Sequence, residues 1–294
     1  MFEQLGLIGC GLMGGSFALA CKRAGLVQRV VGYSKSPSTT ERARQMGVID
    51  VEAPSALLAV AGADLVLLAV PVAATGATLK AIRHLVTPQT LVMDVGSTKQ
   101  DVVLAAQDAL RERFGSFVPA HPIAGREVAG VEHADAALYR GAQVILTPTE
   151  RTLTTQLQRA TNLWRALGCR VSSMSPEAHD RGLAAVSHLP HLLAFAMMGA
   201  INTQDDADRL LAMAGPGFRD FTRIAAADPV LWRDVLLANR EQVLEQSQHF
   251  AAALEQLQHA MRAGDTQLLQ DLITLASTSR ARWRLGDAAL PTDH

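Results

Sequence analysis

The sequence predicts an α/β domain with a doubly wound parallel sheet, followed by an all-α domain. Up to about Thr147, short apolar runs alternate with turns and helix-like stretches, as in parallel strands joined by crossover helices. A glycine-rich segment follows the first apolar run, and no convincing strand pattern occurs from Ser175 onward. We therefore expect an α/β domain at 1–174, a helical domain at 175–285 and a flexible tail at 286–294.

The apolar runs predict six strands, and most of these runs are unbroken, as in strands covered on both faces. The predicted strands are residues 5–8, 29–33, 65–70, 90–95, 117–119 and 143–146. Residues 153–167 have helical spacing and stop at Gly168, and residues 169–173 are a candidate for one more strand at the edge of the domain.

The second half predicts helices with clear start signals. The Ser-Pro-Glu segment at 175–177 combines a capping residue, a proline at the first helical position and an acid in the first turn. The Asp-Pro segment at 228–229 repeats this signal ahead of one long helix that we expect to end near Ala263. The Gly-Pro-Gly segment at 215–217 is expected to be the main interior break.

The predicted helices of this half carry apolar stripes that need a partner surface. A second copy of the chain supplies such a surface most simply, so we expect a homodimer through this domain, with an intrachain bundle as the alternative. The stripe residues are Leu231, Val235, Leu236, Val243, Leu244, Phe250 and Leu254.

The composition narrows the class of protein. Of the 294 residues, 49% are hydrophobic and 19% charged, and 27 basic residues balance 28 acidic ones. No basic excess is left for nucleic acid or an anionic membrane, so we expect neither as a partner. The three cysteines show no metal-ligand spacing and are expected to be buried in a reducing compartment. The start of the chain has no leader pattern, and no run approaches ~20 apolar residues, so we expect a cytoplasmic protein.

The glycine-rich segment predicts a dinucleotide site of the Rossmann type. It lies between a predicted strand and a predicted helix, which is the context that this fingerprint requires. The first glycine permits a tight turn, the second lets a pyrophosphate approach the backbone, and the third lets helix and strand pack closely. The expected cofactor-binding residues here are Gly9, Gly11, Leu12, Met13 and Gly14.

The loop after the second predicted strand favours NADP over NAD. An acid that would bind the adenosine ribose of NAD is missing there. The loop instead offers Ser34, Lys35 and Ser36, and no carboxylate occurs before Glu41. A 2′-phosphate would meet hydroxyl donors and one cation, so NADP is favoured, while NAD stays possible.

Polar side chains follow two further predicted strands. Ser97 and Thr98 stand where a strand ends and a helix begins, a place where α/β sheets bind ligands, although Thr98 fits a helix cap equally well. His121 follows the next strand, in an expected loop before Pro122. A neutral imidazole can accept the proton that an alcohol loses when it is oxidised near neutral pH.

The helical half contributes a second polar group. His188 and His191 flank a proline within a helical stretch, and their spacing alone would suit a metal, but no third ligand has suitable spacing and we expect none. Arg219 and Arg223 lie one helical turn apart and offer forked donors for carboxylates, or form a surface charge pattern with neighbouring acids.

Five segments in this order resemble the prephenate and arogenate dehydrogenase family over nearly the whole chain. They are GLIGCGLMGGSFA, DVGSTK, HPIAGRE, SHLPH and GFRDFTRIA. The resemblance implies a dinucleotide-binding domain, a helical dimerisation domain and the NAD(P)-dependent oxidative decarboxylation of prephenate to 4-hydroxyphenylpyruvate in tyrosine biosynthesis. Arogenate, which would give tyrosine directly, is the alternative substrate.

The resemblance also implies roles for single residues. His121 matches the catalytic histidine that takes the proton of the ring hydroxyl, and Ser97 the serine that holds this hydroxyl and the histidine. Arg223 matches the arginine that binds a substrate carboxylate, and His191 the histidine beside the substrate side chain. The acids of an ionic network at the site entrance correspond to Glu127 and Asp220.

Arg126 adds a cation beside the expected catalytic loop and can face substrate, cofactor phosphate or Glu127. Together with His191 it favours prephenate, which is more anionic than arogenate.

Two other classes of protein compete with this assignment. β-Hydroxyacid dehydrogenases use a lysine of the second domain, whereas this chain has no lysine after Lys99. A non-catalytic NADP-binding protein would need no base, which the presence of His121 argues against.

Overall fold

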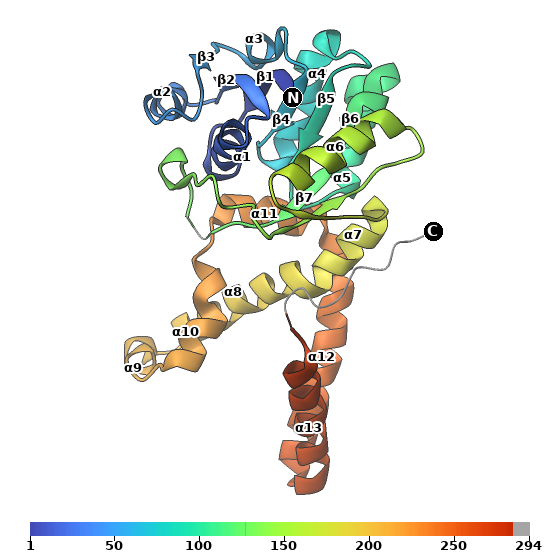
Figure 1. Ribbon diagram of the computed structural model, residues 1–294. Helices are drawn as coiled ribbons and strands as arrows, with labels where there is room; N and C mark the ends of the chain where they lie inside the picture. The colour runs from blue at the N-terminus through green and yellow to red at the C-terminus, as the bar shows by residue number, and fades with distance from the viewer. Residues whose placement is uncertain (127, 285–294) are drawn as a thin grey trace.

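The computed structural model describes residues 1–126 and 128–284, and it divides into an α/β part and a helical part. Figure 1 shows the helical part beneath the sheet, with α7 and α11 next to the α/β part and α12 and α13 projecting away from it. The predicted tail at 286–294 lies outside the described residues. The predicted combination of a doubly wound sheet with a helical second part is confirmed.

The main sheet has six parallel strands in the order β3-β2-β1-β4-β5-β6. Its central strands are apolar and fully buried because helices cover both faces. The strands are β1 (Phe2–Ile8), β2 (Val27–Tyr33), β3 (Val51–Glu52), β4 (Leu65–Leu68), β5 (Leu91–Asp94) and β6 (Phe117–Val118). The two-residue strand β3 was not predicted, since it is too short to show a hydrophobic period.

A second sheet of three strands forms from segments that the sequence placed in one sheet with the others. β7 (Ala120–Ile123) pairs antiparallel with β8 (Gln143–Leu146), and β8 pairs parallel with β9 (Arg170–Ser173). The prediction of one strand at 117–119 was incomplete, because the chain leaves the main sheet at Pro119 and continues as β7. His121 therefore lies within a strand and not in a loop.

Six helices belong to the α/β part. They are α1 (Leu12–Arg23), α2 (Pro37–Gln45), α3 (Ala56–Val60), α4 (Thr75–Ile82), α5 (Gln100–Leu110) and α6 (Thr154–Ala166). Phe17 of α1 packs edge-on against Trp164 of α6, with 5.1 Å between ring centroids, and Tyr139 completes this aromatic cluster. The three cysteines are buried, as predicted.

The helical part begins as its sequence signals predict. The Ser175 hydroxyl accepts a hydrogen bond from the Ala178 amide, and Asp228 caps its helix in the same way at Leu231. The helices are α7 (Pro176–Leu183), α8 (Leu189–Asn202), α9 (Ala207–Ala212), α10 (Pro216–Thr222), α11 (Pro229–Ala238), α12 (Arg240–Ala263) and α13 (Thr266–Arg282).

Two details of these helices differ from the simplest expectation. The long helix predicted from Asp228 to Ala263 is wrong, because the chain breaks at Asn239 into α11 and α12. A π-helical turn, Ala184–His188, joins α7 to α8 directly before Pro190. The wider turn absorbs a proline that has no amide hydrogen to donate.

The segment Pro176–Asn202 is, by length and composition alone, long and apolar enough to cross a membrane, and it is the one such segment among the described residues. Only 22% of its most apolar window is buried in the single chain. One such helix is weak evidence for a membrane span, because apolar helices of soluble proteins meet the same criteria.

Candidate active site

The turn between β1 and α1 has the shape that a dinucleotide pyrophosphate needs. Gly9 has a φ of +97°, and a Cβ there would lie 2.2 Å from the carbonyl oxygen of Ala69. A Cβ on Gly14 would lie 2.0 Å from the Gly9 carbonyl oxygen, whereas one on Gly11 would meet no atom within 4 Å. The outer glycines are thus required by packing, and the middle one leaves open space where phosphates fit against the backbone.

The first turn of α1 faces the same space. Leu12 and Met13 open the helix after Gly11, which has no side chain to cap it. Amides at a helix N-terminus attract phosphate through their hydrogens and through the helix dipole. The residues present therefore fit a dinucleotide, and they include all five positions predicted for it.

Ser34 fixes the loop at the adenosine end of this site. Its hydroxyl accepts a hydrogen bond of 2.8 Å from the Cys10 amide, which joins the end of β2 to the glycine turn. Lys35 and Ser36 are exposed beyond it, at the start of α2. This loop presents hydroxyl groups and a lysine to solvent, and its first acid is the exposed Glu41.

The segment after β7 packs along α1. The Asp135 amide donates to the Ser16 hydroxyl at 2.9 Å, and the Tyr139 hydroxyl donates to the Met13 carbonyl at 2.7 Å. Arg126 forms a half-exposed ion pair of 2.8 Å with the Asp135 carboxylate. The structure thus places Arg126 on the side of α1, and Glu127 lies outside the described residues.

His121 is buried in β7 and contacts a second histidine from the helical part. Its Nδ1 atom lies 2.8 Å from Nε2 of His179, and the two rings meet edge to face. His179 Nδ1 lies 2.7 Å from a carboxylate oxygen of Asp180. His179 and Asp180 lie on α7, so this chain of contacts connects the two parts of the molecule.

Asp180 also caps a helix of the other part. Its two carboxylate oxygens accept hydrogen bonds of 2.8 Å from the backbone amides of Lys99 and Gln100 at the start of α5. These bonds and the contact with His179 lower the pKa of the Asp180 carboxyl despite its burial. Asp180 is therefore an ionised, fully bonded carboxylate.

A buried ion pair holds the Ser97 loop against β7. Lys99 Nζ donates to the Asp94 carboxylate at 2.5 Å and to the Ala120 carbonyl at 3.0 Å. Asp94 in turn accepts hydrogen bonds from the amides of Ala120 and Gly96. Ser97, between Gly96 and Lys99, is half-buried in the loop that this ion pair fixes. The neighbouring Thr98 hydroxyl is buried without a hydrogen-bond partner.

Burial keeps the histidines of this region neutral. Desolvation, reinforced by His179 and Lys99, lowers the pKa of His121 well below 6.5. Desolvation also lowers the pKa of His179, against the effect of Asp180, and lowers that of His188 to about 4. A neutral His121 is ready to accept a proton at physiological pH.

His188 and His191 share one aromatic neighbour on α11. The ring of His191 stacks on Trp232 with 3.5 Å between centroids, and His188 meets the same ring edge-on. The Asn239 side-chain amide contacts His188 Nδ1 at 3.0 Å and donates to the Asp180 carbonyl at 2.8 Å. His191 Nδ1 donates to the Ser187 carbonyl, so Nε2 is the acceptor nitrogen of the neutral ring.

Arg223 and Asp220 occupy the α10 region. Asp220 forms an exposed ion pair with Arg219 at 3.1 Å. Arg223 begins the short 3₁₀ turn that packs against α8, the helix that carries His191. The structure thus brings His121, His179 and His188 together, with the Ser97 backbone next to His188 and with His191 beside His188 on Trp232. The position of Arg223 relative to this group is set by the packing of its turn against α8. The described residues contain no group of three or more side chains suited to a metal ion.

Sequence reasoning missed four residues of this site. His179 and Asp180 stand 58 and 59 positions after His121 and look like ordinary helix residues, and Asp94 with Lys99 looks like an ordinary strand end. The one available signal was two adjacent polar residues, His179 and Asp180, in the first turns of the helix predicted from Ser175.

Two family models match the chain. The nucleotide-binding domain of prephenate dehydrogenase matches residues 17–173, and the dimerization domain of prephenate dehydrogenase matches residues 175–275. Among curated proteins, cyclohexadienyl dehydrogenase of Zymomonas mobilis is 34% identical over 100% of this chain and 98% of its own length. Prephenate dehydrogenase of Bacillus subtilis is 34% identical over 92% of this chain and 73% of its own length.

Solved structures agree with these matches. Prephenate dehydrogenase from Aquifex aeolicus, in complex with hydroxyphenyl propionate and NAD+, has a TM-score of 0.89 and 35% identity over 96% of this chain and 98% of that one. Arogenate dehydrogenase of Synechocystis has a TM-score of 0.80 and 27% identity over 96% of this chain and 100% of that one. The chain is thus a nicotinamide-dependent oxidoreductase that belongs to the prephenate dehydrogenase family.

Proposed function

We propose that this enzyme converts prephenate to 4-hydroxyphenylpyruvate and carbon dioxide, with NADP+ as its preferred hydride acceptor. The observation that carries this proposal is the buried His121 of the α/β part, held by its hydrogen bond to His179 of the helical part. Similarity to a cyclohexadienyl dehydrogenase over 100% of this chain and to a prephenate dehydrogenase over 92% of it supports the substrate class.

The reaction needs a base for the ring hydroxyl and a group that binds a substrate carboxylate. His121 Nε2 accepts the proton of the ring hydroxyl while Ser97 orients that hydroxyl. The nicotinamide of a dinucleotide held at the glycine turn would supply the hydride acceptor for the carbinol carbon. The ring carboxylate then leaves as carbon dioxide, its electron pair aromatises the ring, and the phenolate oxygen takes the proton back from His121.

Substrate recognition falls to the helical part. Arg223 supplies a forked donor for a carboxylate, and His191, held flat by Trp232, faces the substrate side chain. Arg126, Glu127 and Asp220 belong to the entrance, where Arg126 now pairs with Asp135. Arogenate is the second candidate substrate, favoured by the similarity to an arogenate dehydrogenase over 96% of the chain.

The preference for NADP rests on the loop after β2. Lys35 and Ser36 are exposed there, and no carboxylate stands where it would repel a 2′-phosphate. The Ser34 hydroxyl already accepts from Cys10 and keeps its own hydrogen for a ligand oxygen.

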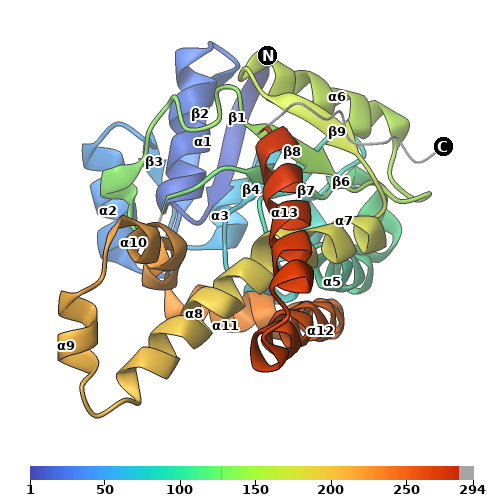
Figure 2. The same cartoon turned by 90° about the horizontal axis from the view of Figure 1, so that it is seen from below.

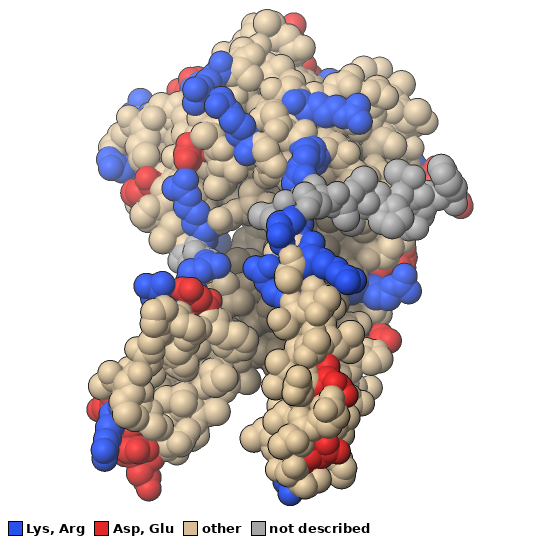
Figure 3. Space-filling view, turned by 60° about the horizontal axis from the view of Figure 1, so that its bottom comes forward, with Lys and Arg blue, Asp and Glu red and all other residues tan. Residues whose placement is uncertain are grey.

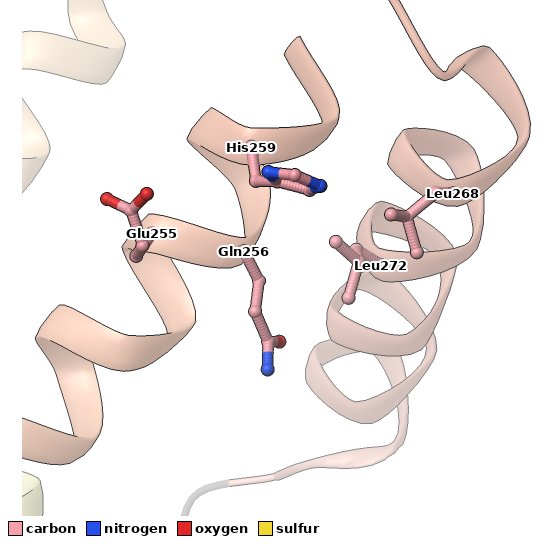
Figure 4. Close-up of a pocket in the computed structure, with 5 residues that line it drawn as sticks. All are labelled: Glu255, Gln256, His259, Leu268 and Leu272. Carbon is pink, nitrogen blue, oxygen red and sulfur yellow. The ribbon is translucent and has the colours of Figure 1, made fainter. Parts of the chain in front are cut away.

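The proposed homodimer forms through the helical part and buries apolar surface that is exposed in the single chain. Figure 3 shows a hollow between two projecting helical arms, and large apolar side chains along these arms are exposed in the single chain. Figure 4 shows a groove between α12 and α13, lined by Leu268 and Leu272 on one side and by Glu255, Gln256 and His259 on the other. Burial of such surfaces against a second copy provides the stability that one chain lacks. We place the dimer in the cytoplasm.

The test is a four-way assay of the purified protein, with prephenate or arogenate and NAD+ or NADP+, followed by formation of reduced nicotinamide. We expect the highest kcat/KM for prephenate with NADP+. Higher kcat/KM with arogenate or NAD+ would correct the substrate or the cofactor, and no turnover in any combination would refute the proposed function.

A further inference from the structure

Three side chains form a continuous buried chain that ends on the proposed base. Asp180 contacts His179 Nδ1 at 2.7 Å, and His179 Nε2 contacts His121 Nδ1 at 2.8 Å. His179 and Asp180 are buried as deeply as the core of the protein. Asp180 also caps α5, whereas, among the described residues, the ring nitrogens of His179 bond only to Asp180 and His121, and burying such polar atoms costs free energy unless they are paired.

The hydrogens in this chain can be placed by elimination. Both Asp180 oxygens accept backbone amides at the start of α5, so this carboxylate is ionised and offers no proton. His179 must then donate from Nδ1, which leaves its Nε2 atom as an acceptor when the ring is neutral. His121 must donate from Nδ1 to that atom, and its Nε2 atom carries a free lone pair.

We propose that His179 and Asp180 are positioning residues that hold His121 as the tautomer with an unprotonated Nε2. This inference rests on the proposed role of His121 as the base. Without the pair, the neutral imidazole can carry its proton on either nitrogen, and one of the two tautomers cannot accept a proton at Nε2. When His121 takes the substrate proton, the nearby Asp180 carboxylate also stabilises the positive charge.

Because His179 and Asp180 lie on the helical part, the tautomer of His121 depends on how the two parts of the molecule pack together. Asp180 comes from α7 but caps α5 of the α/β part, and the Asn239 side chain holds its backbone carbonyl at 2.8 Å. The tautomer of His121 is therefore set by a contact across the junction of the two parts. The titratable groups around this junction are Lys99, Asp94 and Asp101 from the α/β part and His188, which burial keeps neutral, from the helical part.

The first test is nitrogen NMR of the full-length protein with labelled histidine, without substrate. The nitrogen chemical shifts of each imidazole ring distinguish a proton on Nδ1 from one on Nε2. Replacement of each histidine in turn assigns the signals. We expect Nδ1–H for both His121 and His179. A proton on Nε2 of His121 would overturn the inference, whether or not the enzyme turns over prephenate.

The second test is the Asp180→Asn variant. Asparagine has one acceptor oxygen where Asp180 has two. When its NH2 group takes the place of Oδ1, it donates to His179 Nδ1, the His179 proton moves to Nε2, and His121 also carries its proton on Nε2. We expect kcat to fall on the order of 10²- to 10⁴-fold, as when the carboxylate that orients a catalytic histidine becomes an amide. The KM for prephenate and the Kd for NADP+ should stay within about threefold, and the NMR pattern should switch.

The matched control is Asp101→Asn, which removes a half-buried carboxylate from the same first turn of α5 but does not touch His179. We expect its kcat and its histidine tautomers to match the parent protein. Equal losses in both variants, or an Asp180→Asn variant with parental kcat, would overturn the inference. An inactive parent protein with the expected tautomers would instead refute the proposed function alone.

Discussion

His121 combines burial with a fixed orientation, and these two properties set its pH behaviour. Desolvation and the neighbouring His179 and Lys99 lower its pKa well below 6.5. As the proposed base, His121 acts in its neutral form, so we expect activity to be retained above that lowered pKa and lost as pH falls through it.

We therefore expect the acid limb of kcat/KM for prephenate to lie below pH 6.5, the ordinary histidine value. The measurement is a pH–rate profile of the purified enzyme, with stability checked at each pH. An acid limb above pH 6.5 would mean that His121 is not the base or that its site is solvated during catalysis.

Ser34 is the residue at which cofactor choice can be tested. An aspartate there keeps an acceptor for the Cys10 amide and adds the carboxylate that binds an adenosine ribose and repels a 2′-phosphate. For Ser34→Asp we expect kcat/KM with NADP+ to fall at least about 30-fold, which is roughly 2 kcal/mol, while the value with NAD+ is retained or rises. Equal losses with both cofactors would show that the loop does not read the 2′-phosphate.

Single residues were predictable where a local pattern carries them. Gly9, Gly11 and Gly14 follow from the strand, turn and helix around them, and the structure gives each the backbone role expected of it. His179 was not predictable, because its importance lies in a contact with His121 made across the junction of two parts.

At the scale of elements, the break between α11 and α12 places the Asn239 side chain against Asp180 and His188. Asn239 is buried there, and its side-chain amide serves both the Asp180 carbonyl and the His188 ring. Sequence reasoning joined the two helices because Asn239 is a single polar residue within a long apolar stripe, and one such residue does not end a helical period.

Replacement of Asn239 by alanine removes the side-chain partner of the buried His188 Nδ1 atom and one of the two donors to the Asp180 carbonyl, which keeps its hydrogen bond from the Ala184 amide. We expect a loss of about 1–3 kcal/mol, or a fall in Tm of several degrees. The matched control is Asn202→Ala, at an exposed position on α8, which should change stability by less than about 0.5 kcal/mol. Thermal unfolding of both variants makes the comparison, and equal Tm values would contradict the role of Asn239.

The division of residues 117–123 into β6 and β7 could not be predicted, because it depends on pairing with distant segments. Both halves are apolar, and only pairing with β8 tells which sheet each one joins. The main strands were predictable because their buried apolar runs are unbroken, and their order in the sheet is set by contacts between distant segments.

For the whole molecule, the exposed apolar arms are the feature to explain. Figure 2 shows these arms from below, with α8 and the pair of α12 and α13 running in different directions. The order of an α/β part and a helical part was predictable from the change of hydrophobic period near residue 175. How a second copy fills the hollow was not, because surface complementarity has no local sequence pattern.

A charge in the proposed interface tests the dimer. Leu244 on α12 is 60% exposed in the single chain, and we expect Leu244→Glu to weaken the dimer by about 3–5 kcal/mol, or at least 100-fold in Kd. Leu104→Glu on α5, where the side chain is 66% exposed, is the control and should remain dimeric. Light scattering with size-exclusion chromatography gives the masses, and a monomeric parent protein would contradict the proposal.

The most direct measurement of the central claim is turnover of prephenate by the His121→Asn variant beside the parent enzyme. Asparagine keeps polarity and a similar size but cannot accept the hydroxyl proton. We predict that kcat falls about 10²- to 10⁴-fold, the usual contribution of a general base, while the KM for prephenate and the Tm change little. Full turnover by the variant would show that His121 is not the base and would contradict the account.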